Sequence, residues 1–311
     1  MYHRVLDEKD RLTCFSQDGI VVSRDTFEKH MRFLGIHFNV ISLDEFASRI
    51  EENSPFPARS CLVTFDDGWK DNFHNAYPLL EEIGIPSVIF LTTDFIGKQD
   101  QFWQERMTGL LFKLYDAYRG NNNVTVRLAS EFSGVGLENI FSCKRDHLRD
   151  EISKLIPLLK AKSKEEIDAI IQRLADLAGE SGGEANTENA FMDWHEIRRM
   201  AKNGVSFGSH GKSHTLLTRL QPTEVEKEVI ESKGRIEEEL ETTVYAFSYP
   251  NGDYSQQVLD IVMNAGYKLG FSIESGPYSA ADNPHTIRRI NIHEDMTNNI
   301  PMFLARVAGL W

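Results

Sequence analysis

Apolar positions along this chain follow two patterns that alternate with each other. Short runs rich in β-branched and aromatic residues predict buried strands, whereas apolar residues spaced three or four positions apart predict amphipathic helices. The expected strands are residues 2–5, 38–41, 61–65, 87–91, 205–209, 244–249, 267–273 and 286–292. Helices are expected between most of these strands. Repeated strand–helix units indicate an α/β fold with a parallel sheet, and this number of units favours a closed barrel.

Several helix ends carry local signals. Ser23 is expected to cap a helix, and Ser42 with Glu45 forms a capping box for the next one. Asp71 is expected to be an N-cap, and Gly84 is expected to end the helix that follows it. Later helices are expected at residues 223–240 and 258–265.

Residues from about 100 to 190 interrupt the alternation. Amphipathic helices are expected from residue 102 and at residues 148–159, and a capping box of Ser163 and Glu166 begins a third helix that ends near residue 177. The polar, glycine-containing residues 179–189 read as a flexible connector. We therefore expect one catalytic domain over residues 1–311 that carries a helical insertion at about 100–190.

Composition restricts the class of protein. The chain has 311 residues, of which 41% are hydrophobic and 26% charged, as is usual for a globular enzyme. A net charge of −13 argues against nucleic acid as a partner, and no apolar run approaches the roughly 20 residues of a transmembrane helix. The first residues are too charged for a signal peptide, and three cysteines without metal-type spacing do not suggest disulfides. A cytoplasmic location is expected.

Two adjacent carboxylates, Asp66 and Asp67, stand where an apolar run stops before Gly68. Neighbouring side chains at a strand end diverge, so one aspartate can bind a metal while the other moves protons. This arrangement suggests a hydrolase. The same three residues are also ordinary turn chemistry, so the pair needs further ligands to carry a functional assignment.

His210 and His214 follow another apolar run and are candidate ligands. Two histidines four residues apart can point the same way from one helical turn, and neutral imidazole binds zinc and similar ions. Such a pair can equally lie on a solvated face. Together with a carboxylate, the two imidazoles would form a three-ligand site with open positions for water and substrate, as in catalytic metal sites.

Three motifs in this order resemble those of a known family. The segments Thr64–Gly68, His210–His214 and Phe247–Gly252 look like the first three motifs of the polysaccharide deacetylases, the NodB-homology or carbohydrate esterase 4 group. The resemblance implies a distorted (β/α) barrel of seven or eight strands. It also implies a hydrolase that removes N-acetyl groups from an N-acetylated carbohydrate, either a glycan or a lipid- or nucleotide-linked precursor, and releases acetate.

The resemblance also implies a metal centre. Asp67, His210 and His214 match the family's ligands, and the expected ion is Zn²⁺, with Co²⁺, Ni²⁺, Fe²⁺ and Mn²⁺ as alternatives. The ion would polarise the amide carbonyl and activate water. Asp66 matches the catalytic base, and the backbone N–H of Asn251, after the proline of the third motif, matches the oxyanion donor.

The family's general acid usually comes from a late Leu-x-His motif, and no such motif is obvious in this sequence. His293 is the nearest late candidate, and His3 is the alternative. Relatives that act on poly-β-1,6-N-acetylglucosamine look circularly permuted, with an acid histidine in an N-terminal Tyr-His segment like that at residues 2–3. We prefer His3 because it ends the first expected strand at the correct rim of the barrel.

The third motif departs as well. The family usually has an arginine where Ser248 stands, and that arginine pairs with the catalytic base. Arg289 from a late strand could replace it and hold Asp66 ionised, although a surface position beside Arg288 is an equal alternative. Gly211 stands where the family often has Ser or Thr, which would loosen the histidine loop.

Two other functions stay open at this stage. One is a sugar deformylase or other C–N hydrolase on the same scaffold, and the other is a carbohydrate-binding relative without activity, which the altered third motif would suit.

The charge run from Glu224 to Glu241 reads as a solvated helix face. The sequence leaves the sugar, the linkage, the native metal and the oligomeric state unknown.

Overall fold

The computed structural model describes residues 1–119, 121, 132, 137, 140–180 and 190–310. The chain forms two compact units. The first comprises Met1–Thr13, Asp18–Asp100 and Asn189–Trp311, and the second comprises Cys14–Gln17 and Gln101–Glu188. The expectation of one catalytic domain with an insertion stays a prediction.

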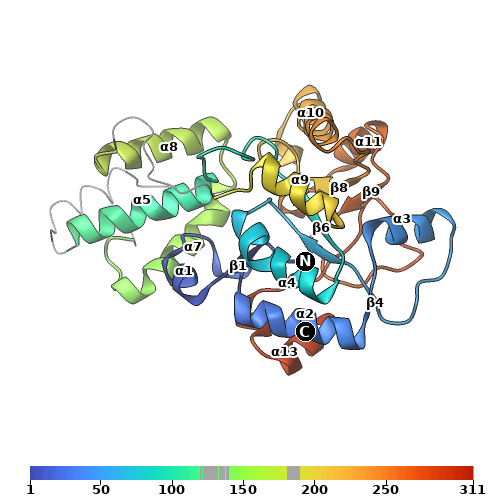
Figure 1. Cartoon of the computed structure of the whole chain (residues 1–311). Helices are drawn as coiled ribbons and strands as arrows, with labels where there is room; N and C mark the ends of the chain where they lie inside the picture. Colours follow the sequence, from blue (N-terminus) through green and yellow to red (C-terminus); the bar gives the residue numbers. More distant parts are fainter. Residues whose placement is uncertain (120, 122–131, 133–136, 138–139, 181–189, 311) are drawn as a thin grey trace. The chain divides into compact units, whose positions relative to one another are not determined.

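The first unit is built on a parallel sheet of five buried strands that follow one another in sequence order. The strands are β5 (Val63–Phe65), β6 (Ser87–Leu91), β7 (Val205–Ser209), β8 (Ala246–Ser248) and β9 (Leu269–Phe271). Their apolar runs are buried on both faces, as is typical of a parallel sheet covered by helices. In Figure 1, helices α4 (Tyr77–Ile83), α9 (Trp194–Lys202), α10 (Pro222–Leu240) and α11 (Gln256–Asn264) lie around these strands.

Two extended segments close the sheet into a ring. Residues 287–292 pair with Phe271 of β9 on one side and with Met1 on the other, and Tyr2 pairs with Phe65 of β5. The first and last parts of this unit therefore meet in the barrel wall. This arrangement confirms the expected α/β barrel, and residues 287–292 contribute one bridge and several hydrogen bonds instead of a full strand.

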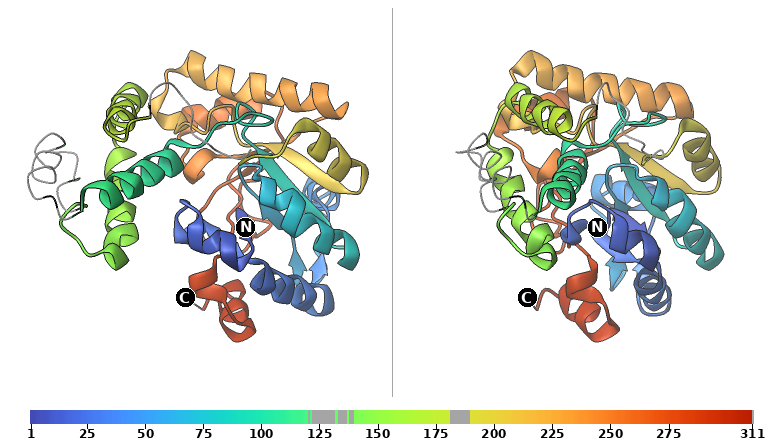
Figure 2. Two further views of the ribbon diagram at one scale, coloured as in Figure 1. Left: turned by 60° about the vertical axis from the view of Figure 1, so that its left-hand side comes forward. Right: turned by 90° about the vertical axis from the view of Figure 1, so that its left-hand side faces the viewer.

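Smaller elements complete the first unit. Two two-stranded parallel sheets pair β1 (Arg4–Leu6) with β2 (Val21–Ser23) and β3 (Asn39–Val40) with β4 (Ser60–Cys61). The remaining helices are α1 (Glu8–Thr13), α2 (Arg24–His37), α3 (Leu43–Glu51), α12 (Glu294–Thr297) and α13 (Ile300–Val307). Helices α2 and α13 lie side by side (Figures 1 and 2). Between them, the His30 ring of α2 stacks on the Phe303 ring of α13 at 3.9 Å between centroids.

Most, but not all, of the predicted helix caps are formed in the structure. Ser23 caps α2 through a hydrogen bond from Thr26, Ser42 caps α3 through one from Glu45, and Gly84 ends α4 in the left-handed conformation with φ of 74°. Asp71 stands at the expected N-cap position, directly before the π-helical turn Asn72–Ala76, but its side chain makes no capping bond there. Its carboxylate instead accepts hydrogen bonds from Val5 and Arg4 of β1.

The second unit is helical in its described residues. Helices α5 (Trp103–Tyr118), α7 (Leu148–Leu159) and α8 (Lys164–Leu177) bury a common apolar core, and they agree with the expected helices. The capping box of Ser163 and Glu166 is formed in both directions. Most of the expected connector at 179–189 lies outside the described residues. In the described part of the chain, none of the helices has the length and apolar character that crossing a bilayer requires.

Candidate metal centre and active site

The loop after β5 separates the side chains of Asp66 and Asp67. Asp67 has φ of 79° and Gly68 has φ of 84°, so the backbone turns sharply directly after Asp66. A Cβ on Gly68 would lie 2.9 Å from the Leu91 side chain, so any other residue would have to displace Leu91 as well as adopt a positive φ. Both carboxylates are buried, with 1% of Asp66 and 3% of Asp67 exposed. Groups this buried need compensating partners, and the two carboxylates find different ones.

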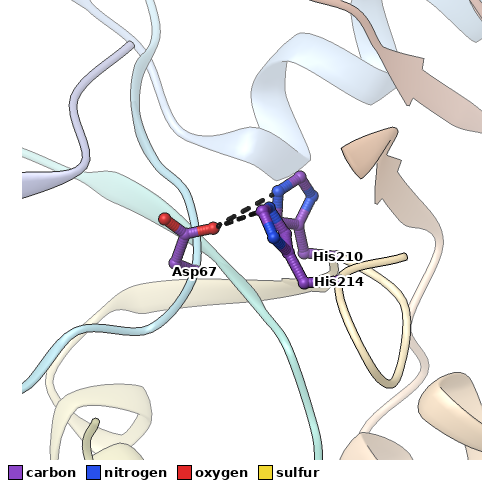
Figure 3. Close-up of side chains that lie close together, drawn as sticks. All are labelled: Asp67, His210 and His214. Carbon is purple, nitrogen blue, oxygen red and sulfur yellow. Dashed lines mark ion pairs between the residues drawn. The ribbon is translucent and has the colours of Figure 1, made fainter. Parts of the chain in front are cut away.

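Asp67 faces the two histidines (Figure 3). Its Oδ1 lies 3.5 Å from Nε2 of His210 and 3.4 Å from Nε2 of His214. One ligand atom from each of the three residues lies within 4.8 Å of the other two. The structure thus brings together the three residues expected to bind metal, and one carboxylate with two imidazoles is a donor set for a catalytic divalent cation.

The tautomer of His210 fits a metal ligand. Its Nδ1 lies 2.7 Å from the carbonyl oxygen of Ser248, and a carbonyl can only accept, so Nδ1 carries the hydrogen and Nε2 presents its lone pair to Asp67. Burial lowers the pKa of His210, partly offset by the Asp66 carboxylate, which favours the neutral imidazole that metal binding requires.

Trp69 orients the carboxylate of Asp67. The indole Nε1–H donates to Oδ2 of Asp67 at 2.8 Å, which leaves Oδ1 toward the histidines. The indole is itself held between Phe191, stacked at 4.6 Å between centroids, and the guanidinium of Arg4 at 4.3 Å. Arg4 pairs with Asp71 at 3.0 Å. This role of Trp69 was not predicted, although its position two residues after a candidate ligand was a usable signal.

The histidines reach the centre from a loop, so the expected helical turn is wrong. His210 directly follows β7, and the chain then passes through left-handed residues at Gly211 (φ 77°) and His214 (φ 58°). Next to Gly211, the loop is held from outside: Oε2 of Glu228 accepts hydrogen bonds from the Lys212 and Ser213 amides at 2.7 and 2.9 Å. Sequence reasoning had assigned Glu228 to a solvated helix face.

Asp66 forms a two-pronged ion pair with Arg289. Nη1 and Nη2 of Arg289 donate to Oδ1 and Oδ2 of Asp66, each at 2.7 Å. Ser248 occupies the place of the family's arginine and donates to Asp66 at 3.2 Å, while it accepts from Arg289 at 2.9 Å. Burial alone would raise the pKa of Asp66, but the charge and hydrogen bonds of Arg289 outweigh it and hold that pKa well below the usual range. Asp66 is therefore a carboxylate, and its Oδ2 lies 4.0 Å from Nε2 of His210.

The two candidate acids lie in different electrostatic surroundings. His3 follows Tyr2 in the barrel wall, and burial lowers its pKa to about 4 against the opposing charge of Asp66, with Arg289 and His210 also acting on it. The Nδ1 atoms of His3 and His293 are both buried and have no hydrogen-bond partner among the described residues. Burial also lowers the pKa of His293, but the charges that act on His293 are those of Asp295, Arg306 and Asp18. Only His3 shares its electrostatic surroundings with the Asp66 pair.

Asn251 lies in the turn after β8. The turn Pro250–Gly252 follows the strand, and Asn251 has φ of 55°. A Cβ on Gly211 would lie 3.7 Å from Cγ of Pro250, so this turn packs against the histidine loop. The expected oxyanion donor is thus on the segment next to the metal ligands.

Comparison with known proteins agrees with this geometry. A family model described as "Polysaccharide deacetylase" matches residues 53–114 and 146–270, which is more than half of the chain. The matched residues contain both candidate metal-binding segments and Asp66. His3 and Arg289 lie outside them.

Two relatives match most of the length of this chain. A putative polysaccharide deacetylase, YxkH of Bacillus subtilis, is 20% identical over 91% of this chain and 70% of its own length. Poly-beta-1,6-N-acetyl-D-glucosamine N-deacetylase of Staphylococcus aureus is 22% identical over 88% of this chain and 68% of its own length.

Solved structures show the same fold. The deacetylase PplD of Streptococcus pyogenes, in complex with acetate, aligns over 99% of this chain and 96% of its own with a TM-score of 0.62 and 18% identity. IcaB from Ammonifex degensii aligns over 98% of this chain and 94% of its own with a TM-score of 0.62 and 15% identity. The expected family, fold class and hydrolase class are confirmed. The chain belongs to the polysaccharide deacetylase family.

Proposed function

We propose that this protein is a metal-dependent N-deacetylase that hydrolyses the N-acetyl group of β-1,6-linked N-acetylglucosamine in a glycan and releases acetate. The observation that carries the proposal is the division of tasks between adjacent carboxylates: Asp67 faces two imidazoles, and Asp66 is paired with Arg289. A metal-binding carboxylate beside a separately held one suits metal-assisted hydrolysis, because binding the ion and moving the proton need different groups.

Asp67, His210 and His214 are the proposed ligands of a divalent cation, with Zn²⁺ as the ion. When bound, such a cation supplies Lewis-acid polarisation of the acetamide carbonyl. Asp67 and His210 are buried and His214 is partly buried, with 13% of its side chain exposed, so the donor set is largely shielded from bulk water. Co²⁺, Ni²⁺, Fe²⁺ and Mn²⁺ suit the same donors, and metal content decides among them.

Asp66 is the proposed general base. Its carboxylate takes the proton from the attacking water as the new C–O bond forms. The pairing with Arg289 and the hydrogen bond from Ser248 fix the carboxylate and keep it ionised. Arg289 and Ser248 together do what the family's single motif arginine would do, so the altered third motif is no reason to favour a protein without activity.

His3 is the proposed donor to the leaving amine. Breaking the C–N bond requires a proton on nitrogen, and the buried Nδ1 of His3, with no hydrogen-bond partner in the described part of the chain, can carry it. The low pKa of Asp66 favours passing the proton on to a more basic group such as imidazole. The backbone N–H of Asn251 is the proposed donor to the negative charge that develops on the carbonyl oxygen.

The choice of substrate rests on similarity together with the position of His3. The Staphylococcus relatives are named for poly-beta-1,6-N-acetyl-D-glucosamine, and the match to them spans 88% of this chain. In this chain the histidine comes from the N-terminal segment that closes the barrel, as expected for the permuted arrangement.

The test is release of acetate from defined oligomers. The zinc-loaded protein is incubated with β-1,6-linked and β-1,4-linked N-acetylglucosamine pentamers, and acetate is quantified with and without chelator. We expect chelator-sensitive acetate release that is faster on the β-1,6 pentamer. Faster release from the β-1,4 pentamer would overturn the linkage. Formate release from N-formyl analogues without acetate release would identify a deformylase, and binding without either product would identify a carbohydrate-binding protein.

A further inference from the structure

The loop that carries the second histidine is held by a residue outside the family's motifs. Glu228 lies in α10, and its Oε2 accepts hydrogen bonds from the backbone amides of Lys212 and Ser213 at 2.7 and 2.9 Å. Its Oε1 accepts from the Ser213 hydroxyl at 2.7 Å. One carboxylate therefore satisfies three donors in the short segment between His210 and His214.

This segment is bent into a shape that needs such support. Gly211 and His214 both have left-handed backbone conformations, with φ of 77° and 58°, and for a residue with a side chain this conformation costs free energy. The surrounding structure must therefore impose it. The carboxylate of Glu228 supplies charge-assisted hydrogen bonds, which are the strong kind.

Gly211 and Glu228 fit each other. A Cβ at position 211 would lie 3.2 Å from Oε2 of Glu228, close enough to press on the atom that binds both amides. The family often has Ser or Thr at position 211, and Gly211 has no such side chain. The hydrogen bonds that hold this loop come instead from Glu228 of α10. Ser232, one turn further along α10, adds a second hold through its hydroxyl, 2.7 Å from that of Ser209.

We infer that Glu228 is a positioning residue for the metal centre, which fixes the 211–213 loop so that the imidazole of His214 is presented to the ion. This inference rests on the proposed function in that Asp67, His210 and His214 bind a cation. Glu228 contacts the loop and not the ligand atoms, so its effect is on how tightly the metal is held.

The test measures zinc affinity of the full chain by competition with a chromophoric chelator, after metal removal. The variants are Glu228→Ala and Glu228→Gln, and the control is Glu231→Ala. Glu231 lies on the same helix and pairs with the Lys212 side chain of the same loop at 2.5 Å, so its removal controls for loss of a charge near the loop.

We expect Glu228→Ala to weaken zinc binding by about 10- to 100-fold, as is typical when a group supporting a ligand is removed. Glu228→Gln keeps the side-chain length and one acceptor oxygen and should show a smaller loss, while Glu231→Ala should bind zinc like the unmodified protein. The Co²⁺ absorption spectrum should change for Glu228→Ala, because ligand geometry changes.

Each result decides a separate question. If the unmodified protein binds no zinc, the proposed function fails. If it binds zinc and Glu228→Ala binds zinc equally well, the inference on Glu228 fails even if the variant's apo form unfolds at a lower temperature. If Glu228→Ala does not fold, Glu228→Gln decides: affinity equal to that of the unmodified protein overturns the inference, and a measurable loss with an unchanged apo unfolding temperature supports it.

Discussion

Arg289 and Asp66, which are 223 residues apart in the sequence, share two parallel hydrogen bonds of 2.7 Å in the buried wall of the barrel. Only 6% of Arg289 and 1% of Asp66 is exposed. The guanidinium offers a planar fork that matches a carboxylate, which fixes the orientation of Asp66 as well as its charge. The two residues therefore act as one unit.

Replacing Arg289 by Met should move the pH dependence of turnover. Without the guanidinium, the largest of the effects that oppose burial is lost, so the pKa of Asp66 rises and the base becomes protonated at a higher pH than in the unmodified protein. The acidic limb of kcat/KM against pH should shift to higher pH for Arg289→Met. Arg289→Lys keeps the charge and should retain a low pKa for Asp66, with slower turnover because the fork is lost.

Stability offers a control for the Arg289 variants. Removing one partner of a buried ion pair destabilises a fold by about 3–5 kcal/mol, so thermal unfolding must be measured beside activity. Because the folded-state pKa of Asp66 is depressed, the pair stabilises the native state above the ordinary aspartate pKa of about 4, and this contribution is lost as pH falls below it. An acidic limb that stays in place in Arg289→Met would contradict the proposed link.

Asp66 and Asp67 should separate chemistry from metal binding. Asp66→Asn should reduce acetate release by about 10²–10⁴-fold, the usual contribution of a general base, while zinc content stays unchanged. Asp67→Asn should lose zinc. Metal analysis by mass spectrometry and an acetate assay check both variants, and normal turnover in Asp66→Asn would refute its assignment as the base.

Trp69→Phe should weaken metal binding without loss of the aromatic stack. Phenylalanine can still pack on Phe191 but cannot donate to Oδ2 of Asp67. We expect about a tenfold weaker zinc affinity, as when other groups that support ligands are removed. Trp194→Phe is the matched control because Trp194 lies on α9 with Arg235 over its ring. Equal zinc affinity in the two variants would show that the indole hydrogen bond has no such effect.

His3→Gln and His293→Gln should distinguish the two candidate acids. His3 experiences the charges of Asp66 and His210, whereas His293 experiences those of Asp295 and Arg306. His3→Gln should therefore lower turnover by about 10²–10⁴-fold with zinc affinity retained, and His293→Gln should stay close to the unmodified rate. Steady-state kinetics on one oligomer decide this, and the opposite ranking would transfer the role to His293.

Local signals predicted the local structure well. The capping box at Ser163 and Glu166 and the glycine stop at Gly84 appear as expected, because these motifs depend on residues within one helical turn. Strands β6 and β7 match their expected ranges: β6 is apolar after Ser87, and β7 alternates apolar Val205 and Phe207 with small residues. Asp71 stands at the predicted N-cap position without making a capping bond, because its carboxylate binds β1, which lies more than sixty residues away along the chain.

The sequence predicted only some of the residues and contacts of the site. The motifs identified Asp66, Asp67 and both histidines, but the backbone that brings the imidazoles together depends on left-handed residues that the spacing of the histidines does not reveal. A late arginine was a candidate partner for Asp66, yet pairing over such a separation is decided by barrel closure. The contact of Glu228 with the histidine loop was not predicted, because Glu228 is one of many charged residues in α10. It lies three residues after the buried Val225, on the side of α10 that faces the barrel.

Closure of the barrel by its first and last segments fixes the order in which the catalytic centre can be assembled during synthesis. The Asp66 loop leaves the ribosome early, while Arg289 is made 223 residues later, and domains generally fold as units as they emerge. Until then the nascent chain carries a base without its counter-charge, and the barrel wall is open between the N-terminal residues beside β5 and strand β9. A chain that ends before Arg289 therefore lacks the partner that orients Asp66, even though every metal ligand is already present in its sequence.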